Sequence, residues 1–173
     1  LEAIDNQSGL PFDYWLLLAR VRFASEARRP AAVRSWEKTE VALAKAAKLD
    51  AAKIEAALVR ASILATKGDA KEAAKQLERL RQEHPRHLSV RIAMADLAAQ
   101  QNRWDDGDKF LAQASAEIGD SLALRLAQAQ HYSRRGNASD RARLAQLADD
   151  LPASFTKEAT ARLKRALAEA WLR

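Results

Sequence analysis

Residues that favour tight turns recur every 34 positions along the middle of this chain, at Gly68, Asn102 and Gly136. Glycine and asparagine tolerate the left-handed backbone that often ends a helix. Each turn is preceded by three apolar residues spaced i, i+4, i+7, a spacing that places them on one face of a helix. The triplets are Ile54, Leu58 and Ala61; Leu88, Ile92 and Ala95; and Leu122, Leu126 and Ala129. Because a second amphipathic segment follows each turn, the sequence predicts a helical hairpin that repeats.

The same pattern extends to both sides of this region. Phe12, Leu16 and Ala19 form a triplet, but Ala19 lies 42 residues before Ala61, so the first unit is longer than the others. Its second helix is expected from Pro30 to about Leu49. The positions expected to be buried there are Trp36, Val41, Leu43 and Ala44. A last triplet, Ala159, Leu163 and Ala166, predicts one more helix after Ser154 with no partner helix behind it. This helix is either a cap over the last hairpin or half of a further unit.

The predicted fold is therefore all-α: a right-handed α-solenoid of about four antiparallel hairpins and a C-terminal helix, in one domain. Capping and stop residues set the boundaries, with Asp50 and Asp69 as N-caps and Pro85 and Gly119 as stops. Gly107 lies inside a helix, where we expect it to allow close packing of a neighbouring helix. The expected segments are a frayed lead-in over 1–10, hairpins over about 11–49, 51–84, 86–118 and 121–151, and a terminal helix over 154–173.

Composition agrees with a helical fold and narrows the chemistry. Apolar residues make up 48% of the 173 residues, and good helix formers dominate. The absence of cysteine removes disulfides, thiol nucleophiles and thiolate metal sites. No run is long enough to span a membrane. The chain begins with Leu1 and has a single methionine, so we read it as a fragment of a longer protein; the compartment stays open, with the cytoplasm slightly favoured over the periplasm.

The 34-residue helix–turn–helix period resembles the tetratricopeptide repeat family, in a degenerate, bacterial-type form. The resemblance rests on the small residues Ala61, Ala95, Ala129 and Ala73, on Gly68 and Gly136 at the turns, and on Pro85 at a repeat end. It implies a protein–protein interaction scaffold in which the first helix of each hairpin lines a groove. The residues that the resemblance places on that groove are Arg20, Phe23, Glu55, Ser62, Thr66, Ser89, Asp96, Gln100, Gln130, Ser133 and Arg134.

Catalysis and metal binding receive little support from the sequence. His84 and His87 flank Pro85, which interrupts any helical metal-binding spacing, and no third ligand is nearby. His131 is expected to pack or to line the groove. The acidic residues Asp105, Asp106 and Asp108 suit the first turn of a helix, where carboxylates interact well with the helix dipole. We therefore expect no enzyme, no cofactor and no metal.

The leading interpretation is a non-enzymatic module that binds a peptide, a partner helix or another domain of its parent chain, with Arg20, Asp96 and Arg134 setting orientation. Nucleic-acid binding ranks second, because the net charge is +6 and Arg91 and Arg125 recur at the 34-residue step. A structural spacer within a longer repeat array is the third reading. The terminal helix, with Trp171 near its end, is expected to favour self-association.

Overall fold

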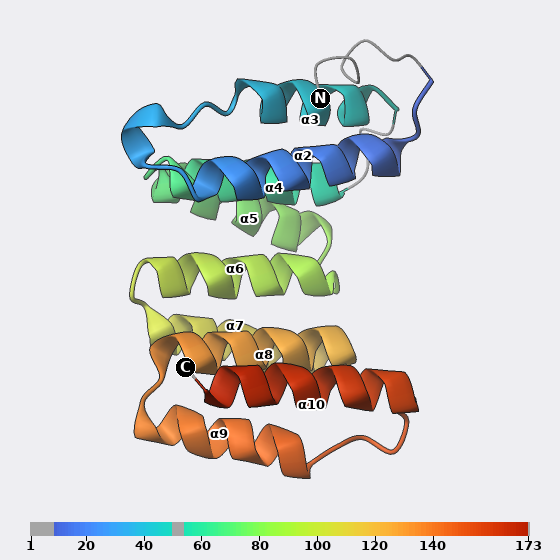
Figure 1. The fold of residues 1–173 in the computed structure, drawn as a ribbon, viewed down its shortest axis with the longest axis vertical. Helices are drawn as coiled ribbons and strands as arrows, with labels where there is room; N and C mark the ends of the chain where they lie inside the picture. The colour runs from blue at the N-terminus through green and yellow to red at the C-terminus, as the bar shows by residue number, and fades with distance from the viewer. Residues whose placement is uncertain (1–8, 50–53, 173) are drawn as a thin grey trace. The chain divides into compact units, whose positions relative to one another are not determined.

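The computed structural model describes residues 9–49 and 54–172. Within these ranges the chain forms nine α-helices and one short 3-10 helix and no strand, which confirms the all-α prediction (Figure 1). No helix of the described ranges is long and apolar enough to cross a membrane. Most of the predicted lead-in and the predicted Asp50 cap lie outside the described residues. The elements are α2 (Phe12–Ala27), η1 (Ala31–Val33), α3 (Glu37–Leu49), α4 (Ile54–Thr66), α5 (Ala70–Glu83), α6 (Leu88–Gln100), α7 (Trp104–Ile118), α8 (Leu122–Arg135), α9 (Ala138–Asp149) and α10 (Lys157–Trp171).

The chain divides into two compact units, with the division inside α5. Unit 1 is Leu1–Leu80 and unit 2 is Arg81–Arg173. The single domain over 11–173 and its right-handed turn remain predictions.

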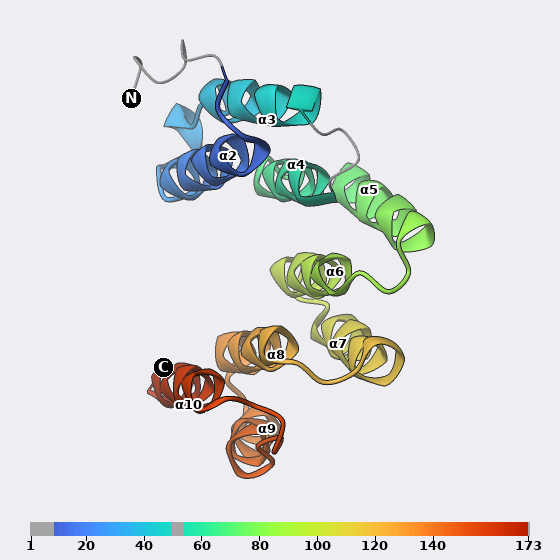
Figure 2. The ribbon, with the colours of Figure 1, turned by 90° about the vertical axis from the view of Figure 1, so that its right-hand side faces the viewer.

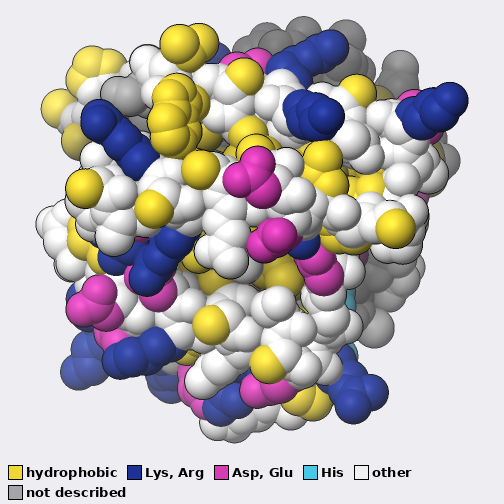
Figure 3. Space-filling view, turned by 90° about the horizontal axis from the view of Figure 1, so that it is seen from below, with side chains coloured by type: hydrophobic (Ala, Val, Ile, Leu, Met, Phe, Trp, Pro, Cys, Tyr) yellow, Lys and Arg dark blue, Asp and Glu magenta, His cyan; other side chains and the backbone are white. Residues whose placement is uncertain are grey.

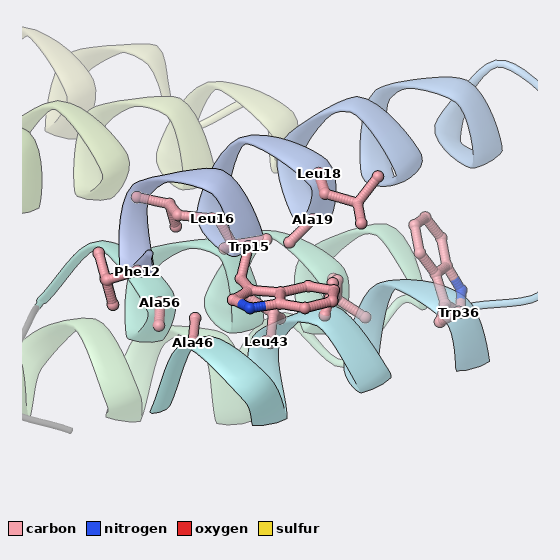
Figure 4. Close-up of a cluster of buried hydrophobic side chains, with 12 residues drawn as sticks. Phe12, Trp15, Leu16, Leu18, Ala19, Trp36, Leu43, Ala46 and Ala56 are labelled. Atoms are coloured by element: carbon pink, nitrogen blue, oxygen red, sulfur yellow. The ribbon is translucent and has the colours of Figure 1, made fainter. Parts of the chain in front are cut away.

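Unit 1 is built around an apolar, aromatic core between α2 and α3. Trp15 of α2 is 3% exposed and lies against Leu43 and Ala46 of α3, which are fully buried (Figure 4). The amine of Lys45 sits over the Trp15 ring, 4.2 Å from its centroid. A buried tryptophan stabilises a small helical unit by several kcal/mol. This core confirms that the Phe12, Leu16, Ala19 face is buried.

The second helix of the first hairpin begins later than predicted, at Glu37 instead of Pro30. The intervening loop is held by side chains: Arg34 donates to the carbonyl of Ala27 at 3.0 Å, and Glu26 accepts from the backbone N–H of Ser35 at 3.0 Å. These bonds satisfy backbone groups that a longer helix would otherwise have used.

The prediction of buried positions on α3 was half right. Trp36 and Leu43 are buried, but Val41 is 41% exposed and Ala44 is exposed too. The helix instead turns a stripe that includes Thr39, Ala42 and Ala46 toward the core. That stripe follows the i, i+3/i+4, i+7 spacing from Thr39, and Val41 and Ala44 lie off it.

The third helix of unit 1 closes the same core. Ala56, Val59 and Ile63 of α4 pack into the cluster formed by α2 and α3. After α4 the chain turns at Gly68, whose φ of +90° lies in the region that favours glycine. Asp69 then caps α5 by accepting from the backbone N–H of Glu72 at 3.2 Å, as predicted.

Unit 2 contains two successive hairpins, α6–α7 and α8–α9, followed by α10 (Figure 2). The predicted turn residues Asn102 and Gly136 both adopt positive φ, +59° and +66°. Ser121 caps α8, and Asn137 forms a reciprocal capping box with Asp140 at the start of α9. The helix boundaries in this unit agree with those predicted to within a few residues.

The last two helices depart from the strict repeat. A step of 34 from Gly107 falls on Arg141, but Arg141 is exposed and Asp140 is buried in its place. On α10, Leu163 is buried as predicted, whereas Ala159 and Ala166 are only half-buried and Leu167 takes the second buried position. Leu163 and Leu167 pack with Ala129 of α8 and Leu144 of α9.

Candidate functional site

The predicted groove residues of unit 2 come together on α6 and α8. Arg134 of α8 donates to the carboxylate of Asp96 on α6 at 3.3 Å. Gln100 lies one turn after Asp96 and Gln130 one turn before Arg134, and both are exposed. Because residues four apart share a helix face, these four side chains form one polar surface, which we call the α6–α8 face. Ser89, at the start of α6, is also exposed.

One predicted groove residue of unit 2 is already used inside the fold. The hydroxyl of Ser133 donates to the carbonyl of Ala170 on α10 at 3.3 Å. Ser133 therefore ties α10 to α8.

The predicted groove residues of unit 1 fall into exposed and packed positions. Arg20 is exposed on α2, whereas Phe23 is half-buried against Trp36, with ring centroids 5.4 Å apart. Glu55 is half-buried in the first turn of α4. The two hydroxyls on α4 donate to carbonyls of their own helix, Ser62 to Leu58 at 3.1 Å and Thr66 to Ser62 at 2.8 Å. The groove role of all five residues remains a prediction.

Unit 2 also contains a cluster of charged side chains that the sequence did not reveal. We call the following residues of α7, α8 and α9 the buried ion cluster, after its two buried members His131 and Asp140: Asp108, His131, Arg135, Asp140 and Arg143. The side chain of Arg143 is 42% exposed. Asp108 accepts hydrogen bonds from Arg143 at 2.7 Å and from Arg135 at 3.0 Å. Arg135 also donates to Asp140, which is fully buried, at 2.7 Å. The cluster thus joins three helices through charge-assisted hydrogen bonds.

His131 completes the cluster on its inner side. Its Nε2 lies 3.1 Å from Oδ1 of Asp108, and its ring packs edge-on against Trp104 at 5.5 Å. Burial lowers the pKa of His131 below its ordinary value, although Asp108 opposes the shift. The ring is 3% exposed, so the neutral imidazole acts as a packing and hydrogen-bonding group. This confirms the packing half of the prediction for His131.

Gly107 makes room for that ring. A Cβ atom at Gly107 would overlap Cε1 of His131 and would lie 3.3 Å from the carbonyl oxygen of Ala95. Glycine at this position therefore lets α7 approach α6 and α8 closely, as predicted.

The electrostatics of Asp108 show how the cluster is balanced. Burial by itself would raise the pKa of this carboxyl, but the hydrogen bonds from Arg143 and Arg135 outweigh it and lower the pKa. Asp108 therefore stays ionised as the partner of two guanidinium groups. The prediction that Asp108 lies in the first turn of its helix was wrong: Asp105 and Asp106 lie in the first turn of α7, whereas Asp108 lies beyond it and contacts α8 and α9.

Arg91 and Arg125, the pair that recurs at the 34-residue step, have matching structural roles. Arg91 is 3% exposed and binds Glu117 and Gln113 on α7. Arg125 binds Asp120 at 2.7 Å and donates to the carbonyl of Leu147 on α9 at 3.3 Å. Each arginine binds the first helix of a hairpin to the second, so neither guanidinium group faces an external phosphate.

The hollow of unit 2 on the α7 side is polar, and its charged side chains are paired with one another. A hollow of about 480 Å³ is lined by residues that include Arg103, Asp106 and Lys109. Arg103 and Lys109 both pair with Asp106, at 3.1 and 3.4 Å. Across the described residues, no group of three or more histidine or acidic side chains is placed to hold a metal ion.

Sequence reasoning missed Arg135, Asp140 and Arg143. The one available signal was Asn137 followed three residues later by Asp140, a capping-box spacing that marks Asp140 as a helix-start residue. Nothing in the repeat pattern indicated that Arg135 and Arg143 would converge on Asp108, because that contact spans three helices.

Comparison with known proteins agrees with this architecture. Residues 64–130 match the model of the tetratricopeptide repeat family. No curated protein and no solved structure matches the chain. The matched segment includes the Gly68 and Asn102 turns and the hairpin α6–α7. A repeat of this kind suggests a protein–protein interaction scaffold. Taken together, the matched segment and the all-helical fold make the chain a tetratricopeptide-repeat-like protein.

Proposed function

We propose that the chain is a non-enzymatic interaction module that holds a peptide or a partner helix against the α6–α8 face. The observation that carries the proposal is the half-exposed Asp96–Arg134 pair with Gln100 and Gln130 beside it. The pair offers one carboxylate and one guanidinium, and each glutamine adds donors and acceptors. Such a surface can bind both the main chain and the charged side chains of a ligand.

The environment of Asp96 supports a binding role. Burial raises the pKa of Asp96, and Arg134 opposes that shift. The carboxylate is thus already partly shielded from water before any ligand arrives. A ligand that covers the face would remove more water, and charge interactions strengthen when water is excluded. The pair would then fix the orientation of the ligand.

Nucleic-acid binding is the alternative, and the described contacts of the repeated arginines weigh against it. Arg91 and Arg125 are held within their own hairpins, and the face of the molecule seen in Figure 3 mixes basic and acidic side chains. Phosphate binding needs basic groups free to replace counterions. The spacer reading, with no ligand at all, is the outcome if nothing binds.

A random peptide library displayed on phage tests the proposal. Enriched peptides would be synthesised and titrated against the wild type, an Asp96→Ala/Arg134→Ala variant and a control, Arg141→Ala/Asp149→Ala. The control removes one exposed charge of each sign from α9. Single- and double-stranded oligonucleotides would be titrated in parallel at two salt concentrations.

We expect peptides whose affinity falls at least tenfold in the Asp96/Arg134 variant and stays unchanged in the control. Peptides that bind both variants as well as the wild type would place the site elsewhere. Oligonucleotide binding that weakens steeply with salt, in the absence of enriched peptides, would promote the alternative.

A further inference from the structure

The outward face of α10 carries the exposed large apolar side chains of unit 2. Among the described residues of this unit, Trp171 and Leu172 stand out, 57% and 85% exposed. Ala168 lies one turn before them, and Lys164 and Arg165 lie one turn earlier still; all are exposed. Residues at these spacings share one helix face. Exposed apolar groups clustered in this way mark interaction surfaces more often than scattered ones do.

This face borders an open apolar hollow. Lys164, Ala168 and Trp171 line it from α10, and Ala145 and Ala148 line it from α9, with a volume of about 220 Å³. In the preceding hairpin the space beside α8 is filled, because α9 covers α8 and Leu144 packs with Ala129.

The order of side chains along α10 makes the face complementary to itself. Along α10 the cations Lys164 and Arg165 come first. The small residue Ala168 follows, and then the large apolar side chains of Trp171 and Leu172. When two such helices cross antiparallel at Ala168, Lys164 of one faces Leu172 of the other, and Arg165 faces Trp171. A guanidinium over an indole ring gains cation–π attraction, and the aliphatic stems cover apolar surface. A parallel crossing would instead set cations against cations.

We propose that two copies of this chain associate through the outward faces of α10, antiparallel about Ala168. The small side chain at the crossing point lets the two helices approach closely. Ala145 and Ala148 of α9 flank the contact on each copy. The arrangement is isologous, so it closes at the dimer and does not propagate. The contact involves no residue of the α6–α8 face and therefore does not depend on the proposed function.

The size of the surface sets the expected strength. We expect a contact made by one helix face and the edge of another to bury less than the roughly 1,200–2,000 Å² that stable complexes bury. We therefore expect a weak dimer whose population rises with protein concentration. Sedimentation equilibrium of the whole chain over about a hundredfold range of concentration measures it.

Ala168→Arg tests the crossing point, because it adds bulk and a third cation where the helices meet. Position 168 is exposed, so the change should leave the fold intact, and circular dichroism checks that it does. Ala116→Arg is the matched control, an exposed alanine of α7 given the same side chain. We expect the dissociation constant to rise at least tenfold for Ala168→Arg and to stay unchanged for Ala116→Arg.

Disulfide trapping tests the orientation, and the chain suits it because it has no cysteine of its own. Single variants Lys164→Cys and Leu172→Cys would be oxidised separately and as an equimolar mixture. An antiparallel crossing about Ala168 predicts a covalent heterodimer from the mixture and little product from either variant alone.

Three results would overturn the proposal. A chain that stays monomeric over the whole concentration range excludes the dimer. Equal weakening by Ala168→Arg and Ala116→Arg places the contact elsewhere. Efficient disulfide formation by each cysteine variant alone, with no preference for the mixture, excludes the antiparallel arrangement.

Discussion

The two units hold their hairpins together by different means. In unit 1, α2 and α3 meet through aromatic and aliphatic side chains, with Trp15 at the centre. In unit 2, α7, α8 and α9 meet through the buried ion cluster as well as through apolar contacts. The comparison shows that one hairpin architecture accepts both solutions. Apolar burial repeats along a helix, so the periodicity of the sequence predicts it. An ion cluster depends on contacts between helices, which the periodicity does not show.

The largest expected effect is in the apolar core. Trp15→Ala should lower the free energy of unfolding by about 4 kcal/mol, because it removes a buried aromatic ring and leaves a cavity. Urea denaturation measures the change. Leu17→Ala, at a neighbouring exposed position of α2, should stay within about 0.5 kcal/mol of the wild type. Equal losses for the two variants would show that the core of unit 1 is not where the structure places it.

The buried ion cluster should be nearly as sensitive. Asp140→Ala removes a fully buried carboxylate and leaves Arg135, itself largely buried, with one partner fewer. Leaving a buried charge underpaired should cost about 3 kcal/mol of unfolding free energy. Asp149→Ala, an exposed position on the same helix, is the control. A loss no larger than that of the control would mean that the cluster holds the three helices only weakly.

Gly107→Ala should destabilise the chain by about 2 kcal/mol, because the added methyl group collides with His131. Helix propensity alone predicts the opposite sign, a gain of about 1 kcal/mol, so thermal or urea unfolding gives a clear reading. A second change, His131→Ala, should recover part of the loss in the double variant, since the two residues are in contact. Stabilisation by Gly107→Ala on its own would contradict the close approach.

The smallest effect is the pH dependence that the cluster contributes. Because the pKa of His131 is lowered in the folded state, the unfolded chain binds more protons near pH 6. Stability from His131 is therefore complete above its ordinary pKa of about 6.5 and is lost as the pH falls through the folded value. The lowered pKa of Asp108 adds a second loss as the pH falls below about 4.

Unfolding free energies measured from pH 7.5 to 5 check the first of these losses. His131→Gln should flatten the profile, whereas Trp15→Ala should shift it downward without changing its shape. A His131→Gln profile as steep as that of the wild type would assign the dependence to other groups.

The sequence was sufficient for the all-α fold and its turns and insufficient for the charges. Helix boundaries, turns at Gly68, Asn102 and Gly136, and the buried alanines follow from local periodicity and capping, which depend on neighbours in the chain. The start of α3 was misplaced, because the loop before it is fixed by side-chain bonds from Arg34 and Glu26.

The contacts of the candidate groove residues were predictable only in part. The position of Asp96 and Arg134 relative to the turn placed both on the first helices of their hairpins, and the structure pairs them. The role of Ser133 in tying α10 to α8 could not be foreseen, because the terminal helix does not keep the repeat step. The 34-residue step of Arg91 and Arg125 suggested contacts with phosphate, because the sequence does not show their partners. Those partners lie on the second helices of the hairpins.

The close approach of Gly107 to His131 also bears on how such chains can be rearranged. Repeats of one family invite the view that any hairpin can be exchanged for any other. Here one hairpin carries the recess and the next carries the ring that fills it, while the ion cluster and the shifted burial of α9 belong to the same junction. A duplicated or transplanted copy of either hairpin would meet a neighbour without the matching shape. The contact between these two hairpins therefore fixes their order. Recombination between repeats would be tolerated only where both hairpins are inherited together.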